Sequence, residues 1–302
     1  MTLKVARRGE ISPFIVMEVM RAAARRESSG AAVWHMEVGQ PGTGAPGGVI
    51  AAARTALGED RLGYTVALGI PELRDAIARH YRDSYGVAVP AGRIVVTTGS
   101  SAGFLLSFLS SFEPGDRVAL AVPGYPCYRN ILQALGVAPV ALMTTAADRF
   151  QPTPELLDRA RAEADIAGLI VASPSNPTGT MLEPGQLEAL VDYCAVHGIR
   201  LISDEIYHGI TYGVRAETAA ALSGDAVIIN SFSKYFSMTG WRLGWMVVPE
   251  DQLRAVESLA QNFFISPPTL SQIAAVAAFD CRDELDANVA RYAENRALLL
   301  EE

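Results

Sequence analysis

Short apolar runs that alternate with amphipathic stretches are the feature that most limits what this chain can fold into. Most of the runs are apolar throughout, as expected for strands whose two faces are both covered by helices. The stretch Pro71–Tyr85 opens with proline at its first position, and the stretch 183–197 stops before Gly198, so both predict helices. The predicted strands are 94–98, 117–122, 168–173, 200–203, 226–230 and 243–248. This rhythm predicts an α/β fold with a mostly parallel central sheet and helices on both faces.

The two ends of the chain fall outside this rhythm. Residues 11–30 predict a helix that is not part of the sheet, and residues 282–302, rich in Ala, Leu, Arg and Glu, predict another. With 302 residues, of which 50% are hydrophobic, the chain can bury a large core.

Charge and cysteine content exclude several functional classes. The 25 basic and 33 acidic side chains give a net charge of −8, so a nucleic-acid partner has no electrostatic support. Three widely separated cysteines form no metal-ligand spacing and favour a reducing compartment. No apolar signal core follows the N-terminus and no segment approaches a membrane-spanning length. We therefore expect a cytoplasmic protein that has no metal site and binds neither nucleic acid nor membrane.

The segment around Lys234 carries the strongest chemical signal. Lys234 directly follows Ser233, lies three residues after Ser231 and precedes Arg242 by eight residues. A lysine that forms a Schiff base must lose its proton near neutral pH, and hydroxyls with an arginine fork suit a phosphate dianion. A pyridoxal phosphate enzyme needs this combination of amine and phosphate contacts. The spacing of Ser231 and Lys234 also fits the acyl-serine motif of penicillin-binding proteins, but the companion Ser-Asp-Asn and Lys-Thr-Gly motifs are absent.

Two further polar segments follow predicted strands. Asp204 comes just after an apolar run and suits either a helix N-cap or a buried carboxylate that keeps a pyridine nitrogen protonated. Asn176 lies in the loop Ser-Pro-Ser-Asn-Pro-Thr-Gly, which fits a rigid turn or a cofactor contact.

The small residues that follow the first predicted strand suggest an anion site. Residues 99–103 run from that strand into a helix, whose first backbone N–H groups and dipole bind anions. An ordinary N-cap explains them as well. Similarly, Tyr125 suits either a core position or a ring stacked on a cofactor.

Together, and in this order, these motifs resemble those of the class I/II aminotransferases of the fold-type-I pyridoxal phosphate superfamily, which are similar to aspartate aminotransferase. The resemblance extends from about Ile11 to the last residue. It implies that Lys234 forms the Schiff base with pyridoxal 5′-phosphate and then acts as the base. It also implies that Asp204 pairs with the ring nitrogen, while Asn176 and Tyr207 contact the ring phenolate oxygen.

The resemblance assigns the remaining contacts as well. The implied phosphate contacts are Ser100, Ser101, Ala102, Ser231, Ser233 and Arg242. Tyr125 stacks on the ring, and Gly39 and Asn176 lie beside the substrate. Tyr64 reaches the phosphate of a neighbouring subunit, which implies a homodimer with shared active sites.

The expected domain division is an N-terminal segment 1–44 belonging to a small domain, a large cofactor-binding domain 45–280, and a linker helix 281–302. This helix begins a C-terminal small domain that is truncated relative to the family. In the resembled family the arginine that binds the substrate carboxylate lies in that C-terminal part. We therefore expect cofactor binding with weakened or absent transamination for this chain.

We predict a transaminase that moves an amino group between an amino acid and a 2-oxo acid. Its segment 261–268 is apolar, which favours neutral or aromatic amino acids as substrates. Alternatives are a β-lyase, decarboxylase or synthase on the same fold, and a non-catalytic pyridoxal-phosphate-binding domain. A nicotinamide dehydrogenase is a further rival, because residues 42–47 match G-x-G-x-x-G. Against it, Pro41 and Pro46 remove backbone donors that a pyrophosphate would need.

Overall fold

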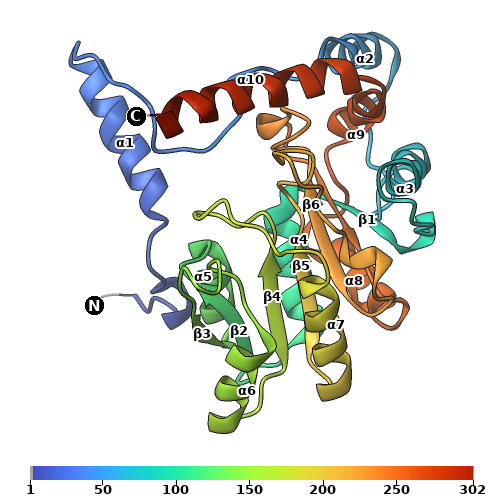
Figure 1. Cartoon of the computed structure of the whole chain (residues 1–302). Coiled ribbons are helices and arrows are strands. Elements are labelled where there is room, and N and C mark those ends of the chain that lie inside the picture. The colour runs from blue at the N-terminus through green and yellow to red at the C-terminus, as the bar shows by residue number, and fades with distance from the viewer. Residues whose placement is uncertain (1–2, 302) are drawn as a thin grey trace.

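The centre of the molecule is one sheet of seven strands (Figure 1), and the structure, a computed structural model, describes residues 3–301. The strands are β1 (Ile94–Thr97), β2 (Arg117–Val122), β3 (Ala138–Met143), β4 (Gly168–Ala172), β5 (Arg200–Asp204), β6 (Val227–Ser231) and β7 (Gly244–Val247). Their spatial order is β1-β7-β6-β5-β4-β2-β3.

The directions of the strands determine which strand ends lie at the same edge of the sheet. The pairs β2–β3, β2–β4, β4–β5 and β5–β6 are parallel, whereas β7 is antiparallel to both β6 and β1. The prediction of a mostly parallel sheet is confirmed. Because β7 alone runs backwards, its first residue lies at the same edge as the last residues of its neighbours.

Helices cover both faces of the sheet, as predicted (Figure 1). The helices are α1 (Ile15–Ser28), α2 (Gly47–Glu59), α3 (Pro71–Tyr85), α4 (Gly99–Ser111), α5 (Pro126–Leu135), α6 (Pro154–Glu163), α7 (Gln186–His197), α8 (Glu250–Phe263), α9 (Thr269–Val276) and α10 (Arg282–Glu301). Successive strand residues point to opposite faces. In β6, Ile228 joins the core under α3, α7 and α9, whereas Val227 and Ile229 join the core under α4, α5 and α8. The strand residues are therefore apolar without alternation.

Strand β3 and helices α5, α6 and α9 were not among the elements that the sequence predicted. β3 lies at the edge of the sheet and is only partly buried. Its six residues are apolar, but Pro139 among them argues against a strand except at a sheet edge. The predicted helix at 11–30 is confirmed as α1, which has no buried residue and stands apart from the layers (Figure 1). The predicted helix at 282–302 is confirmed as α10, except that Glu302 lies outside the described residues.

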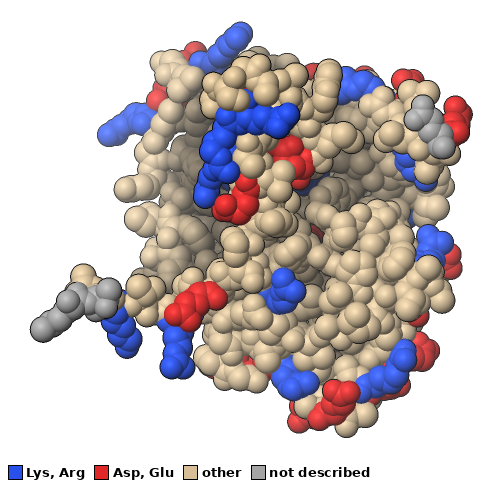
Figure 2. Space-filling view, turned by 90° about the vertical axis from the view of Figure 1, so that its left-hand side faces the viewer, with Lys and Arg blue, Asp and Glu red and all other residues tan. Residues whose placement is uncertain are grey.

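The surface shown in Figure 2 carries basic and acidic side chains interspersed around a hollow region. Within residues 3–301, none of the helices combines the length and the apolarity needed to cross a membrane. The domain division at residues 44 and 280 stays a prediction.

Candidate active site

Four of the predicted site residues meet at one edge of the sheet because of strand direction. Asn176 follows β4, Asp204 ends β5 and Lys234 follows β6. Arg242 precedes β7, and the reversed direction of β7 brings it to the same edge. Ligands of open α/β sheets bind at such carboxyl ends.

Lys234 is half-buried at this edge. Its Nζ donates a hydrogen bond to the carbonyl oxygen of Gly39 over 2.5 Å and lies 5.4 Å from the ring centre of Tyr207. Burial lowers the pKa of Lys234, and the negative charge of Asp204 acts in the opposite direction. The sequence contains two lysines, and the other, Lys4, is exposed on the N-terminal arm. Lys234 is therefore the one lysine in the chain with surroundings that favour a neutral amine.

Asp204 is only 3% exposed and is held at both oxygens. The hydroxyl of Tyr128 donates to Oδ2, and the backbone N–H of Ile206 donates to Oδ1 over 3.0 Å. Burial raises the pKa of Asp204 to about 6, while the two hydrogen bonds oppose that rise. Sequence reasoning missed Tyr128, although it lies in the first turn of α5, three residues after Tyr125, which caps that helix.

Asn176 and Tyr207 come together from two different loops. The Asn176 Nδ2 donates to the Tyr207 hydroxyl over 3.4 Å. Burial raises the pKa of Tyr207, and the hydrogen bond from Asn176 acts against this rise. The pair presents an amide and a phenol, and the phenol ring centre lies 5.4 Å from the Lys234 Nζ.

The start of α4 lies against the Arg242 guanidinium. Gly99 has φ +72°, and a methyl group added there would lie 2.5 Å from Arg242 Nη2. A methyl group added to Gly244 would lie 2.8 Å from the backbone nitrogen of Ser100. Glycine at these two positions thus allows the first N–H groups of a 13-residue helix and a guanidinium to share one small region.

The other residues predicted to contact phosphate differ in accessibility. Ser101 is exposed, whereas Ala102 is buried within α4. The Oγ of Ser231 accepts a hydrogen bond from the backbone N–H of Ser233 over 3.0 Å and lies 3.5 Å from the Leu243 carbonyl oxygen. Both serines are buried, and in this structure the Ser231 hydroxyl stabilises the loop that carries the lysine.

The two predicted aromatic contacts have different settings. Tyr125 is half-buried and packs edge-on against Phe14 and Tyr128, with ring centres 5.7 and 5.3 Å apart. Tyr64 is 85% exposed on a segment that Thr269 holds through a hydrogen bond to the Gly63 carbonyl oxygen. Tyr125 thus lies with the site residues, and Tyr64 projects away from the surface of its own chain.

The G-x-G-x-x-G match at residues 42–47 lacks the strand that precedes such a sequence in dinucleotide-binding proteins. Residues 31–38, which precede it, form no strand, and Pro46 lies directly before α2. A phosphate-binding G-x-G-x-x-G needs a strand before it and a helix after it. The nicotinamide dehydrogenase reading is therefore not supported.

Known proteins of one family match nearly the whole chain. The sequence model of the family described as aminotransferase class I and II matches residues 33–302. A valine–pyruvate aminotransferase of Mycobacterium tuberculosis is 52% identical over 305 residues, covering 100% of this chain and 78% of the relative. An aspartate aminotransferase of Geobacillus stearothermophilus is 31% identical, covering 92% and 72%.

Solved structures agree with the sequence relatives. The crystal structure of an aminotransferase from Mycobacterium tuberculosis has a TM-score of 0.95 at 52% identity, covering 99% of this chain and 78% of that one. The aspartate aminotransferase of Thermus thermophilus with maleate has a TM-score of 0.94 at 30% identity, covering 99% and 80%. These matches give no support to a lyase, decarboxylase, synthase or binding-only reading. The chain belongs to the class I and II aminotransferases, enzymes that use pyridoxal phosphate to transfer amino groups.

Proposed function

We propose that Lys234 is the residue that binds pyridoxal phosphate as a Schiff base and later moves the proton of the substrate α-carbon. The observation that carries this proposal is the setting of its amine, which is half-buried, has a lowered pKa and lies 5.4 Å from the Tyr207 ring. Pyridoxal phosphate, when bound, supplies an electron sink for the substrate α-carbon. Freed by the incoming substrate amine, Lys234 Nζ is the base that removes and returns the α-proton.

Asp204 is proposed to hold the proton on the ring nitrogen of the cofactor. A buried carboxylate with two hydrogen-bond donors of its own has little freedom to turn away from such a partner. A protonated ring nitrogen beside it favours the charged carboxylate and offsets the burial that raises the pKa of Asp204. Asn176 and Tyr207 are proposed to donate to the phenolate oxygen, and Tyr125 to pack on the ring.

The start of α4 and Arg242 are proposed to bind the phosphate. The fit rests on the close approach at Gly99 and Gly244, where added methyl groups would collide with Arg242 Nη2 and with the Ser100 nitrogen. Backbone N–H groups at a helix start and a guanidinium are both donors suited to a phosphate dianion. Ser101, Ala102, Ser231 and Ser233 are proposed to complete this set.

A neutral aliphatic amino acid with a small 2-oxo acid is the proposed substrate pair. The relative with 52% identity carries the name valine–pyruvate aminotransferase. In this chain, Phe263 and Ile265 keep about half of their surfaces exposed in the apolar segment 261–268, and neither could pair with a second substrate carboxylate. Gly39, whose carbonyl oxygen accepts from Lys234, is proposed to lie beside the substrate.

A homodimer with shared sites is proposed from an exposed apolar surface. Tyr64, Val66, Phe263 and Ile265 are each more than half exposed, and the Thr65 backbone N–H donates to a hydroxyl of the neighbouring segment over 3.4 Å. Such a contiguous apolar surface is typical of a protein interface. Tyr64 of one chain is proposed to reach the phosphate in the other. A reducing cytoplasmic location is also proposed, since the three cysteines are unpaired.

An absorbance spectrum of the purified protein with pyridoxal phosphate tests the proposal. We expect a visible band that disappears when valine is added and returns with pyruvate, and little response to aspartate. The Lys234→Ala variant should not form the band. A band in that variant would refute the role of Lys234, and a response to aspartate alone would refute the substrate class.

A further inference from the structure

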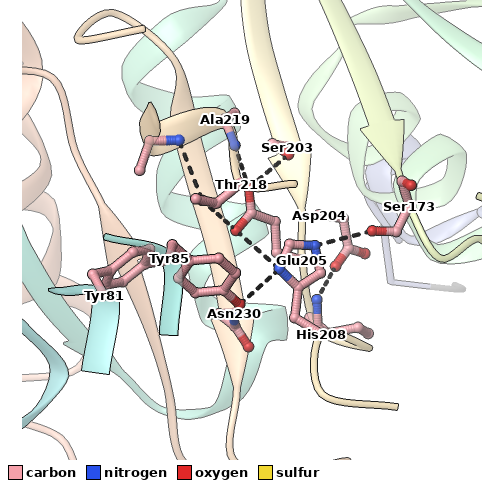
Figure 3. Close-up of polar contacts among 12 residues, drawn as sticks. Tyr81, Tyr85, Ser173, Ser203, Asp204, Glu205, His208, Thr218, Ala219 and Asn230 are labelled. Atoms are coloured by element: carbon pink, nitrogen blue, oxygen red, sulfur yellow. Dashed lines mark hydrogen bonds and ion pairs between the residues drawn. The ribbon is translucent and has the colours of Figure 1, made fainter. Parts of the chain in front are cut away.

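A buried hydrogen-bond chain lies behind the proposed cofactor contacts and centres on His208 (Figure 3). His208 directly follows Tyr207 and is 6% exposed. Its Nε2 lies 3.0 Å from the carbonyl oxygen of Ser173, and its Nδ1 lies 2.9 Å from the hydroxyl of Tyr85. The ring therefore joins helix α3 to the loops that follow β4 and β5.

The partners of the ring determine its tautomer. A carbonyl oxygen can only accept, so Nε2 carries the proton and donates to Ser173. In a neutral imidazole Nδ1 is then an acceptor, and the hydroxyl of Tyr85 must donate to it. Burial lowers the pKa of His208 to about 4, so the ring is neutral near pH 7.

The carboxyl group beside the ring is that of Glu205, whose pKa burial raises to about 7 and whose oxygens are already hydrogen-bonded. Glu205 Oε2 lies 3.5 Å from His208 Nδ1, but it accepts from the Thr218 hydroxyl over 2.8 Å. Glu205 Oε1 accepts from the backbone N–H of Ala219 over 2.8 Å (Figure 3). Arg215, whose guanidinium lies 6.0 Å from the Tyr85 ring centre, and Arg282 are basic side chains that line the same cavity as His208. The Ser173 carbonyl oxygen and the Tyr85 hydroxyl therefore hold the Nε2–H tautomer together, and Tyr85 is the partner whose loss leaves Nδ1 free to donate to Glu205.

The bond from His208 to Ser173 connects the two loops that supply Asn176 and Tyr207. Ser173 precedes Asn176 by three residues, and His208 is bonded to Tyr207 along the chain. At the open side of the same two loops, Asn176 and Tyr207 meet over 3.4 Å. The buried bond thus fixes the separation of the loops below the point where their side chains meet.

We propose that His208, held in its Nε2–H tautomer by Tyr85, is a positioning residue that sets the spacing of Asn176 and Tyr207. This inference rests on the proposed function, in which these two side chains donate to the phenolate oxygen. If Tyr85 no longer donates, Nδ1 can take the proton and turn towards Glu205, and Ser173 loses its donor. The two loops then separate more easily, and the phenolate is less well stabilised.

The test compares one substitution at two neighbouring positions of α3. Tyr85→Phe removes the hydroxyl that bonds to His208, whereas Tyr81→Phe removes a buried hydroxyl that accepts from Trp245 Nε1 over 3.3 Å. For each protein we would titrate the visible band of the lysine-bound cofactor with pH. We expect the midpoint to rise by about half a pH unit or more for Tyr85→Phe, and to stay unchanged for Tyr81→Phe. Equal midpoints in the two variants would overturn the inference.

Two further variants separate positioning from packing. His208→Gln keeps a hydrogen-bond donor and an acceptor, so its midpoint should equal that of the parent. His208→Leu has neither, so its midpoint should rise as in Tyr85→Phe. Nitrogen NMR of histidine-labelled, cofactor-free protein provides a readout that is independent of the cofactor. It should show His208 as the Nε2–H tautomer in the parent and in Tyr81→Phe, and a mixture of tautomers in Tyr85→Phe.

The outcomes distinguish this inference from the proposed function. A parent protein that forms no lysine-bound band refutes the proposed function, and the inference with it. A normal parent band whose midpoint is the same in every variant refutes only the inference. An Nδ1–H tautomer in the parent also refutes it.

Discussion

Replacement of Asp204 by asparagine should make the cofactor-free protein more stable and the enzyme much less active. The asparagine side chain would keep the shape of the aspartate, accept from the Ile206 N–H as before and offer its amide to the Tyr128 oxygen. The main change is the loss of a charge that is only 3% exposed. Burying a carboxylate is costly, and the positive charge of Lys234 offsets only part of that cost, so removal of the charge stabilises the folded state.

The size of the effect follows from the pKa. In the folded protein the pKa of Asp204 is about 6, above its ordinary value of 3.8, so the folded state binds the proton more tightly than the unfolded state. The ionised group therefore reduces stability above about pH 6, and this cost disappears below about pH 4. At 1.36 kcal/mol per pKa unit the cost is about 3 kcal/mol. With an unfolding entropy of ~0.6 kcal/mol/K for a chain of this length, Asp204→Asn should raise Tm by up to about 5 °C.

The assay is thermal unfolding of cofactor-free protein at pH 8 and at pH 4, with Asp192→Asn on the exposed side of α7 as the control. We expect a higher Tm for Asp204→Asn at pH 8, a gap that closes at pH 4, and no effect of the control. Amino transfer by the cofactor-loaded variant should fall by at least about 100-fold, because a preorganised charge partner is lost. A Tm at pH 8 equal to or below that of the parent would refute the reasoning about stability. Undiminished amino transfer would refute the pairing with the ring nitrogen.

Three other substitutions test separate parts of the site. Gly244→Ala should destabilise the fold by about 1–3 kcal/mol, because the added methyl group meets backbone atoms at 2.8 Å; Gly240→Ala, with nothing within 4 Å, should leave the unfolding temperature unchanged. Tyr128→Phe removes the hydroxyl that donates to Asp204 and should raise the dissociation constant for pyridoxal phosphate about tenfold, measured by fluorescence titration. An unchanged constant would contradict that role. Tyr64→Ala should shift a dimer towards monomer in sedimentation velocity, and a parent protein that sediments only as a monomer would contradict the proposed interface.

Most of the site could be predicted because its residues follow apolar runs. Asn176, Asp204 and Lys234 each come at or just after the end of a parallel strand, and the carboxyl ends of parallel strands share one edge. The direction of β7 could not be predicted, since its apolar residues fit either orientation. The position of Arg242 at the same edge depends on that direction.

The parts that the sequence did not reveal depend on contacts between distant segments. Tyr128 meets Asp204 across 76 residues of sequence, and Tyr85 meets His208 across 123. Neither pair has a local pattern, because each side chain alone suits an ordinary buried position. The scarcity of lysine was an unused signal: with only Lys4 and Lys234 in the chain, the choice of a Schiff-base residue is nearly settled by counting.

That scarcity also makes the most direct test simple. Borohydride reduction of the cofactor-loaded protein would fix any Schiff base as a stable bond, and peptide mass spectrometry would locate it. We predict one phosphopyridoxyl group per chain, on Lys234, and none on Lys4. Modification of Lys4 alone, or of neither lysine in a protein that binds pyridoxal phosphate, would contradict the assignment of the active site.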